Sequence, residues 1–322
     1  MQPSALSVVV PAYNEARRLG DSLPPLLDMA RDAGAELIVV DDGSDDDTSQ
    51  VAAAYLAGVP GSKLVRLALN SGKGAAVRAG VAHARGRSIV FMDADLATEL
   101  SDLPTLLEAL ETADIAIGSR VVSGATVDGA SSARAHMGRT FNRVARKVTG
   151  LELRDTQCGF KAFRAPVAQL LFHLGVVDGF AFDVEILALA RRMGYRVAEV
   201  PVHWHAVPGS RVDVVRDPAR MLRDVVLTQA RWRRTRILAV LRALEGDGVV
   251  EVLRANLRAS DNVVPWTDGA LALLPCSEIR VTSSIVDRLR RRQPKLQVTA
   301  TAVPATALLE PEGDELRQAL TA

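Results

Sequence analysis

The chain has 322 residues, of which 48% are hydrophobic and 24% are charged, with 39 basic side chains against 38 acidic ones. This composition excludes a disordered or collagen-like chain, and at about 150 residues per domain the length predicts two domains. A net charge of +1 argues against a dedicated nucleic-acid binder, because affinity for a phosphate backbone needs a clear basic excess.

Neither a disulfide framework nor a membrane span is predicted. The two cysteines, Cys158 and Cys276, stand outside any CxxC pair, and the N-terminus lacks the basic and apolar regions of a signal peptide. The longest uncharged runs, near residues 165–177 and 296–309, fall short of the ~20 residues that a membrane span requires. We therefore expect a cytoplasmic protein that is soluble or lies on a membrane surface.

Short β-branched runs alternate with helical patterns over the first 120 residues. Uninterrupted apolar strands separated by helices are typical of an α/β fold with a mostly parallel sheet flanked by helices, whose ligands bind at the carboxyl ends of the strands. The Pro24-Pro25 pair predicts that the first helix begins late or is kinked. The expected strands are residues 6–10, 36–40, 63–67, 88–92 and 114–117, and the expected helices are residues 16–33, 45–57, 74–84 and 103–110.

Acidic residues follow two of these strands. Residues 45–47, which are all aspartates, suit either capping of the next helix or a functional role, and the pattern leaves both open. Asp93 and Asp95 stand two residues apart at a strand end, where their charges repel unless a cation lies between them. Hard oxygen ligands at this spacing predict Mg²⁺ or Mn²⁺, completed by water and a diphosphate.

A glycine-rich segment, Asn70-Ser71-Gly72-Lys73-Gly74, lies between the two acidic sites. The glycines allow close backbone approach, and Lys73 supplies a point charge for a phosphate or a nucleotide. The Walker pattern is absent, so the segment alone is weak evidence of function.

Taken together, the motifs resemble the family 2 glycosyltransferases of the GT-A fold, and within them the polyprenyl-phosphate and dolichyl-phosphate sugar synthases, most closely the glucosyltransferase branch. The resemblance covers about residues 5–235. The motifs that carry it are Val9-Val10-Pro11-Ala12-Tyr13-Asn14-Glu15, Asp41-Asp42-Gly43-Ser44, Asn70 to Gly74, Asp93-Ala94-Asp95-Leu96, Gly118-Ser119-Arg120, Asp155 to Lys161, Phe182-Asp183-Val184-Glu185, Glu199 to Trp204 and Gly209-Ser210-Arg211.

The resemblance implies a role for each matching residue. The nucleotide pocket and its surroundings would be formed by Pro11, Ala12, Tyr13, Glu15, Asp41, Asp42, Lys73 and Ala94, with a carboxylate accepting a hydrogen bond from the base. Asp93 and Asp95 would hold the metal on the donor diphosphate, with Arg120 beside the phosphates. Arg134 and Arg211 would bind the lipid phosphate or the departing diphosphate.

The implied activity is an inverting transfer of a hexose from a nucleotide-sugar donor, with UDP or GDP as the nucleotide, to a polyprenyl or dolichyl phosphate. Ala97 stands where mannosyl-transferring relatives tend to carry Gln, which favours glucose over mannose. Two alternatives stay open: a GT-A enzyme that acts on a soluble hydroxyl such as a glycerate or a polysaccharide, and a non-catalytic nucleotide-sugar sensor.

Two further groups of residues each admit two interpretations. Asp183 and Glu185 could face the acceptor as general bases, or Asp183 could cap or pack a helix. His203 and His205 could complete a metal site or be ordinary surface or core histidines.

The last third of the chain predicts a basic helix and a small module. Residues 217–244 interleave arginines with apolar residues around Trp232, which fits a helix lying on an anionic membrane or one packed on the domain. We expect a catalytic domain over residues 1–235 and a small α/β extension over residues 236–322 that regulates, dimerises or packs. Membrane contact would be peripheral or through a membrane-protein partner, at the cytoplasmic face.

Overall fold

The computed structural model describes residues 5–129, 132–207, 216–234, 237–244, 249–257, 262–266, 269–276, 279–294 and 296–304. The chain divides into two compact units between Val226 and Leu227, and each unit is described by itself. The domain boundary expected at residues 235 and 236 falls on positions outside the described residues.

The first unit is built on a seven-stranded sheet of order β3-β2-β1-β4-β7-β5-β8, in which β7 runs antiparallel to β4 and β5 and the other pairs are parallel. The mostly parallel α/β fold expected from the sequence is therefore confirmed. The strands are β1 Leu6–Ala12, β2 Glu36–Asp41, β3 Lys63–Arg66, β4 Ser88–Met92, β5 Ile115–Ser119, β7 Phe160–Arg164 and β8 Val197–Pro201. A short parallel pair joins β6 Thr126–Asp128 to β9 His203–His205.

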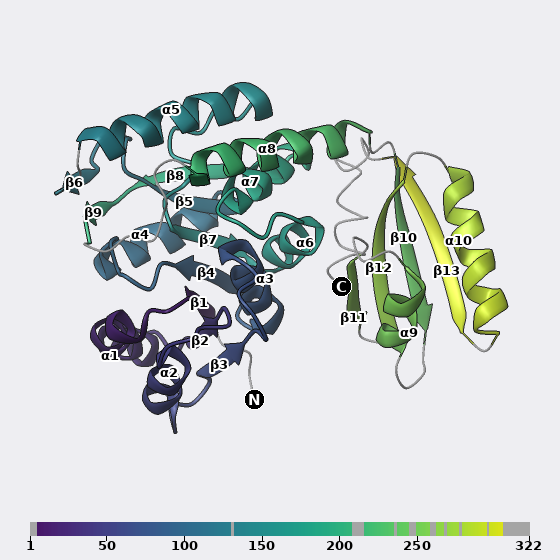
Figure 1. Ribbon diagram of the computed structural model, residues 1–322, viewed down its shortest axis with the longest axis horizontal. Helices are drawn as coiled ribbons and strands as arrows, with labels where there is room; N and C mark the ends of the chain where they lie inside the picture. The colour runs from purple at the N-terminus through teal and green to yellow at the C-terminus, as the bar shows by residue number, and fades with distance from the viewer. Residues whose placement is uncertain are drawn as a thin grey trace. The chain divides into compact units, whose positions relative to one another are not determined.

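Helices cover both faces of the sheet (Figure 1). They are α1 Ala16–Asp32, α2 Thr48–Leu56, α3 Lys73–His83, α4 Leu103–Glu108, α5 Ser132–Thr149, α6 Ala165–Leu174, α7 Phe182–Arg192 and α8 Arg216–Arg234, with 3₁₀ turns at Leu100–Asp102 and Ala109–Glu111. Val8 and Val10 share a core with α1, α2 and α4. On the opposite face α3 approaches Val9, and Phe91 packs against Phe182 of α7 at 5.6 Å between ring centroids. Burial on both faces explains why the strands are apolar throughout.

Helix α1 begins at Ala16 and continues through Pro24 and Pro25 to Asp32, so the expected late start is wrong, and a kink at the prolines stays a prediction. A proline inside a helix removes the donor to the carbonyl four residues earlier, which for Pro24 is that of Gly20. The hydroxyl of Tyr55 donates to this carbonyl at 3.2 Å. A side chain from α2 thus replaces the missing backbone donor.

The second unit is a four-stranded antiparallel sheet of order β11-β12-β10-β13 with two helices, in the chain order β-α-β-β-α-β. Its elements are β10 Ile237–Leu244, α9 Val249–Asn256, β11 Asn262–Trp266, β12 Gly269–Cys276, α10 Ile279–Arg292 and β13 Gln297–Pro304. A core that includes Leu241, Leu253, Ala272 and Leu289 joins the sheet to both helices.

The single helix expected over residues 217–244 is wrong in its second half, since α8 ends at Arg234 and residues 237–244 form strand β10. β10 is central in its sheet and pairs with β12 on one side and β13 on the other. These partners lie about 30 and 60 residues further along the chain, so local periodicity gave no sign of them. Among the described residues, no helix combines the length and apolar character needed to cross a bilayer.

Gly43, in the loop after β2, and Gly20, in α1, are matched positions at which a Gly→Ala substitution tests how tightly that loop is packed. Gly43 has a φ of 66°, and a Cβ there would lie 2.4 Å from the carbonyl carbon of Leu69, whereas a Cβ on Gly20 would meet nothing within 4 Å. We expect Gly43→Ala to destabilise the fold by about 3 kcal/mol or more, because left-handed strain and overpacking each cost roughly 1–3 kcal/mol. Gly20→Ala should stabilise it by about 0.5–1 kcal/mol, the gain of alanine over glycine in a helix. Urea unfolding of both variants checks the two signs.

Candidate active site

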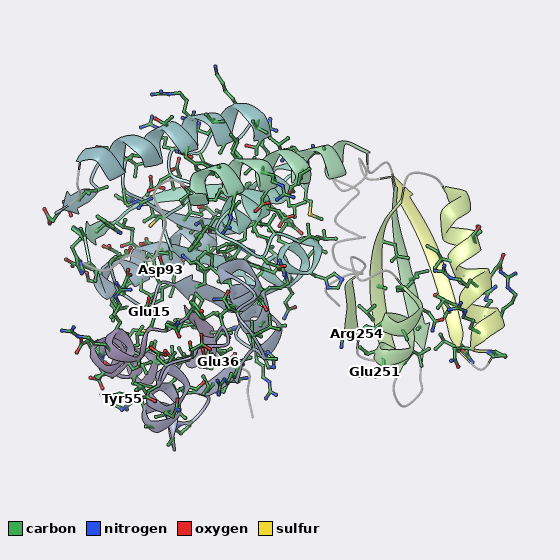
Figure 2. The ribbon with its side chains drawn as sticks, viewed as in Figure 1. Glu15, Glu36, Tyr55, Asp93, Glu251 and Arg254 are labelled. Carbon is green, nitrogen blue, oxygen red and sulfur yellow. The ribbon has the colours of Figure 1, made fainter. Side chains whose placement is uncertain are left out.

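The carboxyl ends of β1, β2, β3 and β4 bring four loops to one edge of the sheet. Glu15 follows β1 and Asp93 follows β4, and both lie at this edge (Figure 2). Pro11 and Ala12 are the last residues of β1, and Tyr13, which is half-buried, comes next. The sequence predicted that the candidate nucleotide-binding residues lie at the carboxyl ends of the strands, and the strand topology brings these ends to one edge.

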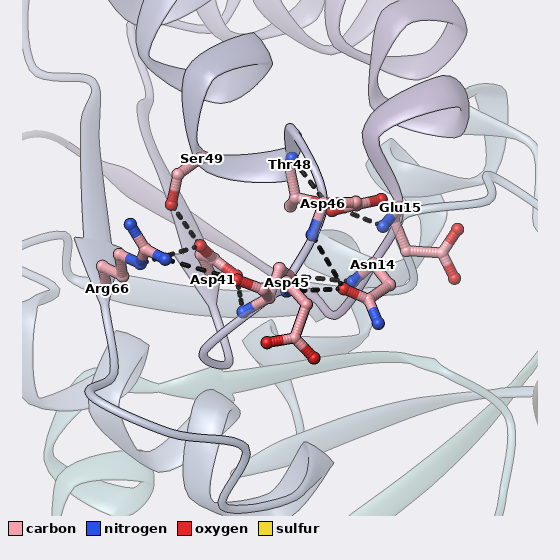
Figure 3. A network of polar contacts seen from close by, with 9 residues as sticks. Asn14, Glu15, Asp41, Asp45, Asp46, Thr48, Ser49 and Arg66 are labelled. Carbon is pink, nitrogen blue, oxygen red and sulfur yellow. Dashed lines mark hydrogen bonds and ion pairs between the residues drawn. The ribbon is translucent and has the colours of Figure 1, made fainter.

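Side chains tie the loop after β1 to the loop after β2 (Figure 3). Asn14 has a φ of 52°, and its side-chain oxygen accepts from the backbone N–H of Asp45 at 2.9 Å. The backbone N–H of Glu15 donates to the hydroxyl of Thr48 at 2.8 Å. Asp46 accepts from the backbone N–H of Thr48 at 3.0 Å, so the capping interpretation holds for Asp46.

Asp41 is buried and structural in character. Its carboxylate accepts from the backbone N–H of Ser44 at 2.9 Å and from the hydroxyl of Ser49, and Arg66 lies 3.4 Å away. This carboxylate therefore shapes the loop after β2.

Asp42 fastens the glycine-rich segment to the same loop. Its two oxygens accept from the backbone N–H groups of Ser71 and Gly72, each at 2.8 Å. Burial, opposed by these bonds, raises the pKa of Asp42 above its ordinary value. The glycines of this segment pack closely against the backbone of Asp178. A Cβ on Gly72 would lie 2.4 Å from the carbonyl oxygen of Asp178, and the N–H of Gly74 donates to that oxygen at 2.7 Å.

Lys73, at the first turn of α3, pairs with Asp93. Its ammonium lies 2.6 Å from Oδ1 of Asp93. Although burial opposes it, the neighbouring carboxylates of Asp93, Asp183 and Asp95 raise the pKa of Lys73 above its ordinary value. The lysine is thus held as a cation among acidic side chains.

Asp95 completes the acidic pair after β4. Its Oδ1 accepts from the backbone N–H of Ala97 at 3.1 Å. Burial and the like charge of Asp93 raise the pKa of Asp95, with Lys73 and Arg18 opposing the shift. Arg18 also pairs with Glu15 at 2.8 Å, so it links the loop after β1 electrostatically to the acidic pair. Sequence analysis missed Arg18, whose only local signal is its place one helical turn after Glu15.

The two carboxylates fit a divalent cation. Both are hard oxygen donors at one strand end, and the carboxylate of Asp93 can take its position because residue 159 is a glycine, where a Cβ would lie 2.1 Å from Oδ2 of Asp93. No group of three or more ligating side chains occurs among the residues that the structure describes, so further ligands would come from water or a bound diphosphate. A small cavity beside Asp93 is lined by Ala97, Gly159 and Trp204, among others.

Arg120 lies beside Trp204, one of the residues that line this cavity. Its guanidinium makes a bidentate pair with Asp155 at 2.7 and 2.9 Å and lies 5.7 Å from the centre of the Trp204 ring. Although burial opposes it, this pairing lowers the pKa of Asp155 and keeps the carboxylate ionised. Arg120 is therefore pre-oriented as a fixed positive charge.

The carboxylates of Asp183 and Glu185 have partners inside the protein. Asp183 is buried and lies 2.6 Å from the ammonium of Lys161. Oε2 of Glu185 accepts from the backbone N–H groups of Val176 and Val177 at 2.9 and 2.8 Å. This favours the packing alternative, and a general-base role for Asp183 stays a prediction.

The remaining predicted residues are placed less fully. Arg134 lies in α5 but its side chain is not described, and Arg211 falls outside the described residues. Cys158 is buried, and burial raises the pKa of its thiol to about 11.

His203 pairs with Asp102, a residue that sequence analysis missed. Nδ1 of His203 lies 2.7 Å from Oδ1 of Asp102, and the backbone N–H of His203 donates to Oδ2 at 2.7 Å. The pair anchors β9, which carries Trp204, to the 3₁₀ turn before α4. This position fits the surface alternative for His203.

The His203–Asp102 pair predicts a pH-dependent contribution to stability. The hydrogen bond to Asp102 raises the pKa of His203 above its ordinary 6.5. The stabilisation is therefore complete below pH ~6.5 and is lost as the pH rises through the higher folded-state pKa. We expect His203→Gln to lower the melting temperature more at pH 6 than at pH 9. In an Asp102→Asn background the same substitution should have an equal effect at both pH values, and an unequal effect there would contradict the assignment.

The chain is similar in sequence to several known proteins. The family model described as Glycosyl transferase family 2 matches residues 7–172. Among curated proteins, the dolichyl-phosphate beta-glucosyltransferase of Drosophila melanogaster is 37% identical over 244 residues, covering 70% of this chain and 75% of that protein. The Saccharomyces cerevisiae protein of the same name is 33% identical over 244 residues, covering 69% and 73%.

Solved structures support the fold. Glucosyl-3-phosphoglycerate synthase from Mycobacterium tuberculosis, in complex with phosphoglyceric acid, aligns with a TM-score of 0.54 at 21% identity, covering 70% of this chain and 80% of that one. A complex of that enzyme with Mn²⁺, uridine diphosphate and glucosyl-3-phosphoglycerate aligns with a TM-score of 0.51 at 22% identity, covering 70% and 78%. At this identity the likeness concerns the GT-A fold alone.

Proposed function

The chain belongs to glycosyltransferase family 2, and from that premise we propose that it transfers glucose from a nucleotide-sugar donor to the phosphate of a polyprenyl or dolichyl lipid. The observation that carries the acceptor and the sugar is the 33–37% identity to dolichyl-phosphate beta-glucosyltransferases over about 70% of the chain. The site supports it with an acidic pair, a lysine and a fixed arginine at one strand edge.

The donor would lie along the loops after β1 and β2, with its diphosphate toward Asp93 and Asp95. These two carboxylates would hold Mg²⁺ or Mn²⁺, which when bound neutralises charge on the departing diphosphate. Arg120, oriented by Asp155, adds a positive charge beside Trp204, which lines the cavity next to Asp93. Arg134 and Arg211 remain proposed contacts to phosphate.

The proposed reaction is a single displacement. An oxygen of the lipid phosphate forms a bond to the sugar C1 while the bond from C1 to the diphosphate oxygen breaks, and the electron pair leaves with the nucleoside diphosphate. The configuration at C1 inverts, so an α-linked donor gives a β-linked product. A phosphate monoester has a second pKa of about 6 and is already anionic near neutral pH, so it needs no general base. That agrees with a buried, lysine-paired Asp183.

Removing either carboxylate of the acidic pair tests the proposed site. We expect Asp93→Asn and Asp95→Asn each to lower the rate by about a hundredfold or more, the loss typical of one electrostatic contact to developing charge. Asp21→Asn, an exposed position on α1, should leave the rate unchanged. The assay follows radiolabelled sugar from UDP-glucose, GDP-mannose and related donors into chloroform-soluble lipid, with Mg²⁺ or Mn²⁺ present. Label appearing only in a water-soluble glycoside, with 3-phosphoglycerate or a polysaccharide as acceptor, would contradict the lipid acceptor, and an α-linked product would contradict inversion.

We also propose that α8 contacts an anionic membrane. Met221 and Val225 bury one side of the helix, while Val226 and Leu227 are 47% and 55% exposed. Arg220 and Arg223 are exposed on the same helix. Exposed apolar residues flanked by arginines suit the headgroup layer, where a lipid acceptor would present its phosphate.

Vesicle binding tests the role of α8. The double variant Val226→Ser/Leu227→Ser should lose most of its co-sedimentation with vesicles that contain phosphatidylglycerol, because its apolar contact is removed. Val127→Ser, which changes another exposed apolar side chain, should co-sediment like the wild type. Equal binding by all three proteins would refute a membrane role for these residues.

A further inference from the structure

The pairing of Lys73 with Asp93 has a consequence for the order in which ligands bind. The ammonium lies 2.6 Å from the carboxylate that the proposed function assigns to a metal ion. A divalent cation bound by the same carboxylate would lie roughly 2.1 Å from its oxygen. Lys73 and the metal would then carry three positive charges around one carboxylate.

The backbone of Lys73 is held in place, so only its side chain can move away from a bound metal. The N–H groups of Gly72 and Gly74, on either side of it, donate to the Asp42 carboxylate and to the carbonyl of Asp178. The four-carbon stem of lysine allows the ammonium to move while the helix start stays in place. A metal on Asp93 would therefore push the ammonium away and leave the first turn of α3 unchanged.

A displaced ammonium would need another anion. The charge of Asp183 acts on Lys73, but its carboxylate is already paired with Lys161 at 2.6 Å. Asp95 is the second proposed metal ligand. A partly buried ammonium without a partner is costly, and the diphosphate of a bound nucleotide is the remaining anion that the proposed function brings to this edge.

We propose that Lys73 is the resident counter-ion of Asp93, that a divalent metal must displace it, and that a nucleoside diphosphate receives it. This inference rests on the proposed function for its two ligands. It makes metal and nucleotide binding cooperative, because either ligand alone must first break the ion pair between Lys73 and Asp93. By linkage, the factor by which the nucleotide tightens metal binding equals the factor by which metal tightens nucleotide binding.

Mn²⁺ binding without nucleotide is the decisive measurement. The signal of free Mn²⁺ in electron paramagnetic resonance gives the affinity for the full-length protein and for Lys73→Met, with no turnover required. We expect Lys73→Met to bind Mn²⁺ about tenfold more tightly than the wild type, within the usual range of coupling between sites. Lys73→Arg, which keeps the charge, should resemble the wild type, as should Lys147→Met, an exposed lysine on α5.

The same titrations with UDP and with GDP measure the coupling. In the wild type the nucleotide that binds should tighten Mn²⁺ binding, and in Lys73→Met this gain should be smaller, leaving only the part that comes from the diphosphate as a direct ligand of the metal. If Lys73→Met binds Mn²⁺ no more tightly than the wild type, while Asp95→Asn abolishes Mn²⁺ binding, the proposed metal site stands and the counter-ion role is refuted. If the wild type binds no Mn²⁺ with either nucleotide, both the metal assignment and the counter-ion role fail.

Discussion

Two carboxylates stand two residues apart at the end of β4 and repel each other. Positively charged side chains around this strand end offset the repulsion. Lys73 reaches Asp93 from α3, Arg18 acts on Asp95 from α1, and Arg120 lies beside Trp204, which lines the cavity next to Asp93. Negative charge in a partly buried setting is tolerated only with such partners, and its cost falls when a metal ion joins them. The helices around the sheet are therefore tied to the acidic pair by charge as well as by apolar packing.

A second set of contacts holds the loops that carry these charges. Asn14 and Asp42 accept hydrogen bonds from backbone N–H groups of neighbouring loops, and Asp41 accepts one within the loop after β2, so loops from three strands are joined by polar contacts. Hydrogen bonds to backbone donors give a loop a fixed shape that apolar packing cannot give a short, polar segment. Asp41 and Asp42 thus shape the site through the loops that they hold.

Much of the first unit could be predicted, because burial on both faces of a parallel sheet makes strands apolar throughout, and the strand runs could be found from this alone. The need for positive charge beside the acidic pair could be predicted, because like charges at such spacing repel each other. The continuity of α1 through Pro24 could not, since it depends on a hydroxyl from α2, and strand β10 could not, since its partners lie far along the chain. The pairing of Lys73 with Asp93 was equally hidden, because it joins two motifs that sequence analysis treated separately.

Strand β7 runs against β4, so its beginning, and not its end, reaches the catalytic edge, where Phe160 pairs with Met92. Gly159 then touches Asp93, although the two lie 66 positions apart in the chain. The segment that leads into β7 is consequently constrained at two positions, because residue 159 must leave room for the carboxylate of Asp93 and Asp155 must reach Arg120.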